Sequence, residues 1–163
     1  MRLALKQAVM AADADEVPVG AVMYNVDGAL VGKAWNQTRT LNDPTAHAEI
    51  LAITQAAAAA GDWRLAGHIL YVTKEPCPMC AGAIVLARIP MVVWGVSDPQ
   101  RGGAISRFQI LQTPELNHRA EILSGILENE CADVLQSFFR RRRKENALDS
   151  HASPKPLPPE LPL

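Results

Sequence analysis

The spacing of apolar and polar positions along the chain predicts a regular succession of helices and strands. Two apolar segments flank Asp27-Gly28, a pair that is typical of the turn in a β-hairpin. An alanine-rich segment without proline, ended by Gly61, is typical of a helix. In order, we predict a helix over residues 2–15, strands over 19–25 and 30–35, a helix over 46–60, a strand over 69–73, a helix over 78–87, a strand over 91–96 and a long C-terminal helix with one apolar face.

The succession of strand, helix and strand between residues 69 and 96 predicts how the middle of the chain folds. Two strands joined by one helix form a right-handed crossover and pair in parallel. The predicted fold class is therefore α/β, with helices layered against a sheet.

Composition divides the chain into one folded domain and a tail. Of the 163 residues, 48% are hydrophobic, which is sufficient for a packed core. We assign residues 1–147 to this domain. Residues 148–163 are a Pro-rich tail that we expect to be extended or disordered, because proline interrupts helices and central strands.

The charge balance limits how the protein can bind nucleic acid. The net charge is −1 and the pI is about 6.4, so no overall positive field attracts a polyanion. A local basic patch is needed instead, and the candidate is Arg140, Arg141, Arg142, Arg143 and Lys144. The alternative is a solvated helix end, where cations are favoured by the helix dipole.

Apolar segments and cysteine usage indicate the compartment. The first sixteen residues lack the uninterrupted apolar segment of a secretory signal, and no segment has the length of a membrane span. Two of the three cysteines form a CxxC pair, which is typical of a metal or redox site in a reducing compartment. We therefore expect a cytoplasmic protein without a membrane partner.

The motif that carries chemistry is His47-Ala48-Glu49, followed some thirty residues later by Cys77 and Cys80. A redox pair is expected beside a thioredoxin-like pattern, and here a hairpin precedes it. A structural zinc site needs a fourth protein ligand, and no other histidine or cysteine has the required spacing. Three ligands with an open position are typical of catalytic zinc, so we expect one zinc ion per subunit.

Glu49 is the only carboxylate inside the motif, and we expect it to transfer protons between water and substrate. A role as a zinc ligand is the alternative. In a regular helix His47 and Glu49 face different directions, so both reach one site only if His47 lies at an irregular helix start.

The combination H-x-E…P-C-x-x-C is the signature of zinc-dependent nucleobase deaminases, a class that includes the tRNA adenosine deaminases. Over residues 1–145 the chain resembles bacterial tRNA-specific adenosine deaminases of the TadA type, in the cytidine/deoxycytidylate deaminase superfamily. The matching stretches are EVPVGAV (16–22), WN (35–36), DPTAHAEI (43–50), LYVT (70–73), EPCPMCAGAI (75–84), ARI (87–89), NHR (117–119) and FFRRRR (138–143).

This resemblance implies a three-layer α/β/α cytidine-deaminase-like fold, in which helices flank a mixed five-stranded sheet. It also implies a homodimer that converts adenosine to inosine at the wobble position of a tRNA anticodon, usually in an arginine tRNA. The implied roles are zinc binding by His47, Cys77 and Cys80, proton transfer by Glu49, and substrate contacts by Asn36 with the flipped nucleotide, Asp98 near the sugar 2′-hydroxyl and His118 with RNA. For His118, a structural hydrogen bond is an equal alternative.

Two other functions remain open from the sequence. Guanine, cytosine and nucleoside deaminases share the zinc motif and act on free small molecules, although the cationic segment 140–144 has no evident use in them. A non-catalytic zinc-stabilised binding module is the second alternative. Glu49 argues against it, because a structural zinc gains nothing from a nearby carboxylate.

Overall fold

The computed structural model describes residues 1–149, so the expected Pro-rich tail lies outside the described residues from residue 150 onward. Among residues 1–149, no helix is both long enough and apolar enough to cross a membrane. The elements are α1 (Arg2–Asp13), β1 (Gly20–Tyr24), β2 (Leu30–Trp35), α2 (Ala48–Ala60), β3 (Ile69–Lys74), α3 (Pro78–Leu86), β4 (Met91–Val96), the 3₁₀ helix η1 (Ile110–Gln112), β5 (Glu121–Leu123) and α4 (Glu128–Asp149).

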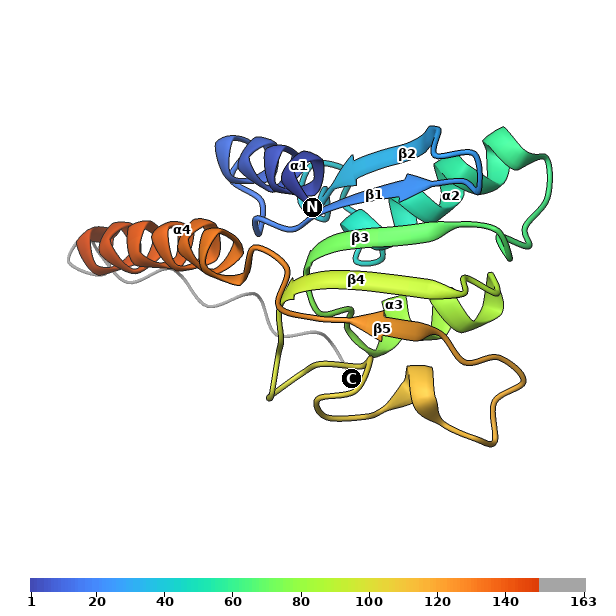
Figure 1. The fold of residues 1–163 in the computed structure, drawn as a ribbon. Helices are drawn as coiled ribbons and strands as arrows, with labels where there is room; N and C mark the ends of the chain where they lie inside the picture. Colours follow the sequence, from blue (N-terminus) through green and yellow to red (C-terminus); the bar gives the residue numbers. More distant parts are fainter. Residues whose placement is uncertain (150–163) are drawn as a thin grey trace, which may run out of the picture.

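The strands form one mixed sheet of five strands in the order β2-β1-β3-β4-β5 (Figure 1). β1 pairs with β2 and with β3 in antiparallel fashion, whereas β3–β4 and β4–β5 are parallel pairs. The crossover predicted between residues 69 and 96 is confirmed, because α3 connects the parallel strands β3 and β4.

Helices cover both faces of the sheet, which confirms the predicted three-layer architecture (Figure 1). The main core lies between the sheet and the layer of α2 and α3, where Met23, Leu70, Trp94 and Ile84 are fully buried. α1 and α4 pack on the other face, against β1 and β4 respectively.

Small residues let α2 approach the sheet closely. Ala48, Ala52 and Ala56 follow one another at four-residue intervals and are completely buried. A Cβ atom added to Gly32 of β2 would lie 2.5 Å from the carbonyl oxygen of Ala52. The close packing of α2 on β2 fixes where α2 begins, and the candidate site lies at that helix start.

Three local features differ from the predicted elements. The hairpin turn is a five-residue loop over residues 25–29 in which Gly28 adopts a φ of 76°. β5 and η1 have only three residues each, too few for a periodic pattern of apolar positions. α4, whose end the apolar pattern did not predict, extends through Asp149.

Candidate active site

His47 is the N-cap of α2 and lies outside the helix. Its backbone is extended, with φ −76° and ψ 152°, and the helix begins at Ala48. Oδ1 of Asn36 accepts a hydrogen bond from the Ala48 amide at 3.0 Å and so satisfies one of the free donors of the helix start. The irregular start that the sequence required is therefore present, and His47 and Glu49 both line one cavity.

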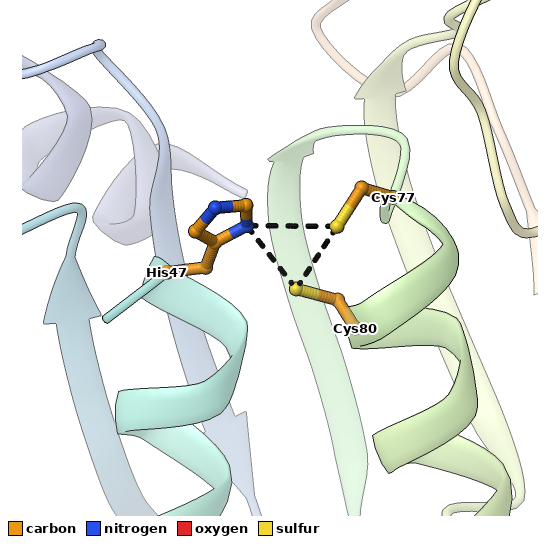
Figure 2. A group of neighbouring side chains, drawn as sticks. All are labelled: His47, Cys77 and Cys80. Atoms are coloured by element: carbon orange, nitrogen blue, oxygen red, sulfur yellow. Dashed lines mark hydrogen bonds between the residues drawn. The ribbon is translucent and has the colours of Figure 1, made fainter. Parts of the chain in front are cut away.

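Cys77 is the N-cap of α3, also with an extended backbone, and Pro78 occupies the first helical position. Proline is favoured there because its fixed φ suits a helix and its missing N–H has no helical partner to lose. Cys80 follows in the first turn. Figure 2 shows the starts of α2 and α3 facing each other, with the three side chains pointing toward one another.

The donor atoms of His47, Cys77 and Cys80 form a small triangle (Figure 2). Nδ1 of His47 lies 3.6 Å from Sγ of Cys77 and 3.5 Å from Sγ of Cys80, and the two sulfur atoms are 3.6 Å apart. Tetrahedral zinc with ligand distances of about 2.3 Å to sulfur and about 2.0 Å to nitrogen separates sulfurs by about 3.8 Å, and sulfur from nitrogen by about 3.5 Å. The triangle therefore has the dimensions of three ligands around one zinc ion.

The two thiols are electrostatically unequal. The hydrogen bond between Cys77 and Cys80, helped by His47, lowers the pKa of Cys77 to about 4. The same contact, together with burial, raises the pKa of Cys80. Cys77 is thus the thiol of the pair that ionises more readily, and a cation bound in the triangle favours the second ionisation as well.

Glu49 lies beside the triangle but does not belong to the group of donors that surrounds one point. Its side chain is 3% exposed, and Oε2 is buried without a hydrogen-bond partner among the described residues. Burial raises the pKa of this carboxyl group. A buried carboxyl with a free oxygen and a raised pKa is suited to proton exchange. This geometry favours the proton-transfer role over the alternative role as a ligand.

A cavity of about 500 Å³ opens onto Glu49 and onto His47 and Cys77 of the triangle. This volume lies in the range of pockets that hold small molecules. Its lining residues are Val17, Val19, Asn36, Thr38, His47, Glu49, Lys74, Glu75, Cys77, Asp98, Gln100, Arg101, Leu135 and Phe139.

Glu16 holds the first loop of the cavity wall in place. This buried carboxylate accepts hydrogen bonds from the amides of Arg39 and Thr40, at 2.8 and 2.7 Å, and from the hydroxyls of Thr38 and Thr40. The loop that follows Asn36 is therefore fixed by a side chain from the segment between α1 and β1.

Glu75 holds the opposite loop. Its buried carboxylate accepts hydrogen bonds from the amides of Asp98, Ile105 and Ser106 at 2.8 to 3.0 Å, and from the Ser106 hydroxyl. A Cβ atom added to Gly102 would lie 2.5 Å from this carboxylate, so the loop packs directly on it. Glu75 thus ties the loop after β4 to the segment that carries Cys77.

Asp98 lies at the cavity, as the resemblance implied for a substrate contact. Its Oδ1 accepts hydrogen bonds from the amides of Gln100 and Arg101, and its Oδ2 pairs with Lys74. The carboxylate is therefore held in one orientation by fixed partners.

His118 is not brought to the cavity. Its Nε2 lies 2.8 Å from the carbonyl oxygen of Ile89, directly before β4, whereas Asp98 follows the other end of β4. The strand separates the two residues, so the structural hydrogen bond describes the observed contact of His118. A contact of His118 with RNA outside the cavity stays a prediction.

The cationic segment at the end of α4 divides into two groups. Arg141 and Arg142 form ion pairs with Asp15 and with Glu145. Arg140 donates to the hydroxyl of Ser137. Arg143 and Lys144 form no ion pair with another residue of the range 1–149, and both are exposed.

Several residues that line the cavity or support its loops were not identified from the sequence. Glu16 and Glu75 appeared only within the matching stretches, because nothing in their spacing marks a buried carboxylate. Phe139 was assigned to the apolar face of α4, yet it is 43% exposed and lines the cavity. The available signal was an aromatic side chain at the edge of that face.

Comparisons with known proteins agree with this geometry. The family model of MafB19-like deaminases matches residues 1–143. The tRNA-specific adenosine deaminase of Bacillus subtilis (strain 168) is 47% identical over 145 residues, which are 89% of each chain. The enzyme of that description from Agrobacterium fabrum is 45% identical and covers 90% of this chain and 95% of its own.

A solved structure from a study of A-to-I editing by tRNA:A34 deaminases has a TM-score of 0.80 and 46% identity, covering 83% of this chain and 97% of that one. A guanine deaminase from Bacillus subtilis has a TM-score of 0.57 and 29% identity, covering 88% and 90%. The chain belongs to the family of tRNA-specific adenosine deaminases.

Proposed function

We propose that the protein hydrolyses adenosine to inosine at the wobble position of a tRNA anticodon, and that an arginine tRNA is its substrate. The observation that carries this proposal is the buried Glu49 carboxyl, whose Oε2 has no hydrogen-bond partner among the described residues, beside the triangle of His47, Cys77 and Cys80 in the wall of a cavity of about 500 Å³. The family relationship supports adenosine as the target base.

His47, Cys77 and Cys80 hold the zinc ion in this proposal. Zinc bound there supplies a Lewis acid that lowers the pKa of water at its open position. Glu49 accepts a proton from the attacking water and delivers it to the ring nitrogen N1, while the water oxygen bonds to C6. Glu49 then takes the hydroxyl proton and passes it to the amino group, the C6–N bond breaks, and ammonia leaves.

Asn36 and Asp98 orient the nucleotide in this proposal. The side-chain oxygen of Asn36 is occupied by the Ala48 amide, which leaves its NH₂ group to donate to the base. Asp98 lies at the cavity, where a carboxylate can accept a hydrogen bond from a ribose 2′-hydroxyl.

The target nucleobase has to leave its stack to reach Glu49, because the carboxyl group is buried in the wall of the cavity. An anticodon loop presents such a nucleobase at a low free-energy cost of unstacking, because the loop is single-stranded. The cationic segment Arg140–Lys144 binds the phosphates of the adjoining stem in this proposal.

We also propose that the protein is a homodimer in the cytoplasm. Met79 and Leu86 lie seven residues apart on α3 and are exposed, Leu86 by 72%. Gly82 lies between them, and a Cβ added there would meet no neighbouring atom. This exposed apolar face is suited to burial against a second copy and so supports the proposed dimer, which light scattering of wild type against Leu86→Glu tests.

The function is tested with a synthetic RNA hairpin that carries an ACG anticodon loop, digested after incubation and analysed for inosine by mass spectrometry. Free adenosine, cytidine, cytosine and guanine are incubated in parallel. Inosine from the hairpin alone is the expected result. Ammonia from a free base or nucleoside, without inosine in the hairpin, would assign the protein to the small-molecule deaminases instead.

A further inference from the structure

Lys74 places a cation at the wall of the cavity. It is the last residue of β3, pairs in register with Val96 of β4, and lines the cavity together with Glu49 and Asp98. Its side chain is 30% exposed, so the ammonium group is in reach of a molecule that enters.

The ion pair with Asp98 fixes the ammonium group of Lys74. Asp98 is itself held by two loop amides through Oδ1, and its own amide is bound by Glu75. A lysine ammonium has three N–H donors, and this pair uses one of them. Two donors of a pre-positioned cation therefore remain for a substrate.

The charges of the cavity wall indicate which chemical group of a substrate the Lys74 ammonium would bind. Glu49, Glu75 and Asp98 are the acidic residues of the wall, Lys74 and Arg101 are its lysine and arginine, and Lys74 pairs with Asp98. A nucleobase or free nucleoside carries no negative charge for Lys74 to bind. A nucleotide extruded from an RNA strand enters with a phosphodiester on each side, and a phosphate oxygen is the preferred partner of such a cation.

We propose that Lys74 binds a phosphodiester adjacent to the extruded adenosine and thereby makes the cavity select a nucleotide within an RNA strand over a free nucleoside. This inference rests on the proposed function. In the alternative, Lys74 only anchors Asp98 and makes no contact with the substrate.

The test removes the cation and the phosphate charge separately. Lys74→Met is compared with wild type and with Lys6→Met, which removes an exposed lysine of α1 that does not line the cavity. The hairpin is prepared with native linkages, or with a neutral methylphosphonate on the 5′ or the 3′ side of the target adenosine. Lys74→Arg retains the charge, and thermal unfolding verifies that each variant is folded.

A methylphosphonate on one side is expected to lower kcat/KM of wild type and of Lys6→Met about tenfold, as loss of a charged hydrogen bond does. With native linkages, kcat/KM of Lys74→Met is expected to be about tenfold lower than that of wild type. The same methylphosphonate should not lower kcat/KM of Lys74→Met further, whereas it should still lower kcat/KM of Lys74→Arg.

Two results would overturn the inference: equal sensitivity of Lys74→Met and wild type at both linkages, or insensitivity of wild type at both. If Lys74→Met does not fold, the wild-type and Lys74→Arg responses decide the matter. Failure of the proposed function is distinct, because wild type would then form no inosine in the native hairpin.

Discussion

The amide of Asp98 donates a hydrogen bond to Oε2 of Glu75 over 2.8 Å, and this bond joins the loop after β4 to the segment that leads into α3. The carboxylate that receives it is buried and accepts three further hydrogen bonds from Ile105 and Ser106. The position of Asp98 at the cavity thus depends on a side chain only two residues before Cys77.

Glu75→Ala should lower the free energy of unfolding by about 2 kcal/mol or more, because buried donors of the loop lose a charged acceptor. Urea denaturation measures the change. Glu115→Ala is the matched control, since Glu115 is exposed. Equal urea midpoints for the two variants would contradict the anchoring role of Glu75.

Asp98 should make stability depend on acidity. Burial opposes its ionisation, but the hydrogen bond from Lys74 and the loop amides outweigh this, and the pKa of Asp98 is lowered from its ordinary 3.8. Its stabilising contribution is therefore complete above pH 3.8 and is lost as the pH falls through the lower folded-state pKa. Urea titrations at several pH values should show a smaller acid loss for Asp98→Asn than for wild type, and parallel curves would refute this.

The two buried cysteines should respond differently to the same substitution. Cys80→Ala removes a corner of the donor triangle and should abolish stoichiometric zinc and lower the thermal midpoint. Cys131→Ala alters a thiol that packs near Gly95 on the other face of the sheet, so zinc content should stay at about one per chain. Elemental analysis of purified protein measures both, and full zinc in Cys80→Ala would be incompatible with the ligand assignment.

Within the cationic segment, substitutions of Arg143 and Lys144 should change RNA binding without breaking an ion pair inside the protein. Arg141 and Arg142, in contrast, are paired with Asp15 and Glu145. Neutralising Arg143 and Lys144 should reduce the slope of log affinity against log salt by about 1.5, without loss of stability. Binding titrations at several salt concentrations measure this slope. An unchanged slope would support the alternative that both residues belong to a solvated helix end and do not bind RNA phosphates.

Sequence patterns were sufficient for the long elements and for selecting the three residues whose donor atoms form the triangle. The periods of apolar residues predicted β4 with its observed bounds, and CxxC spacing with the preceding proline placed Cys77 and Cys80 at a helix start. Such features can be predicted because a strand or a helix start is determined largely by residues that are close together in the sequence.

Long-range contacts account for what the sequence did not reveal. Glu16 contacts residues 38–40 and Glu75 contacts residues 98–106, and such pairs leave no local signature. The meeting of His47 with Cys77 across thirty positions follows from the packing of α2 and α3 against one sheet. His118 was ambiguous for the same reason, since only the fold shows that β4 separates it from the cavity.

The proton-transfer role of Glu49 is the central claim, and Glu49→Gln tests it most directly. Inosine formation in the ACG hairpin and zinc content are measured on the same preparation of wild type and variant. We predict unchanged zinc and fold, with a loss of kcat of at least about 100-fold, because the amide cannot exchange protons. Retention of near wild-type turnover in the zinc-loaded variant would contradict the account.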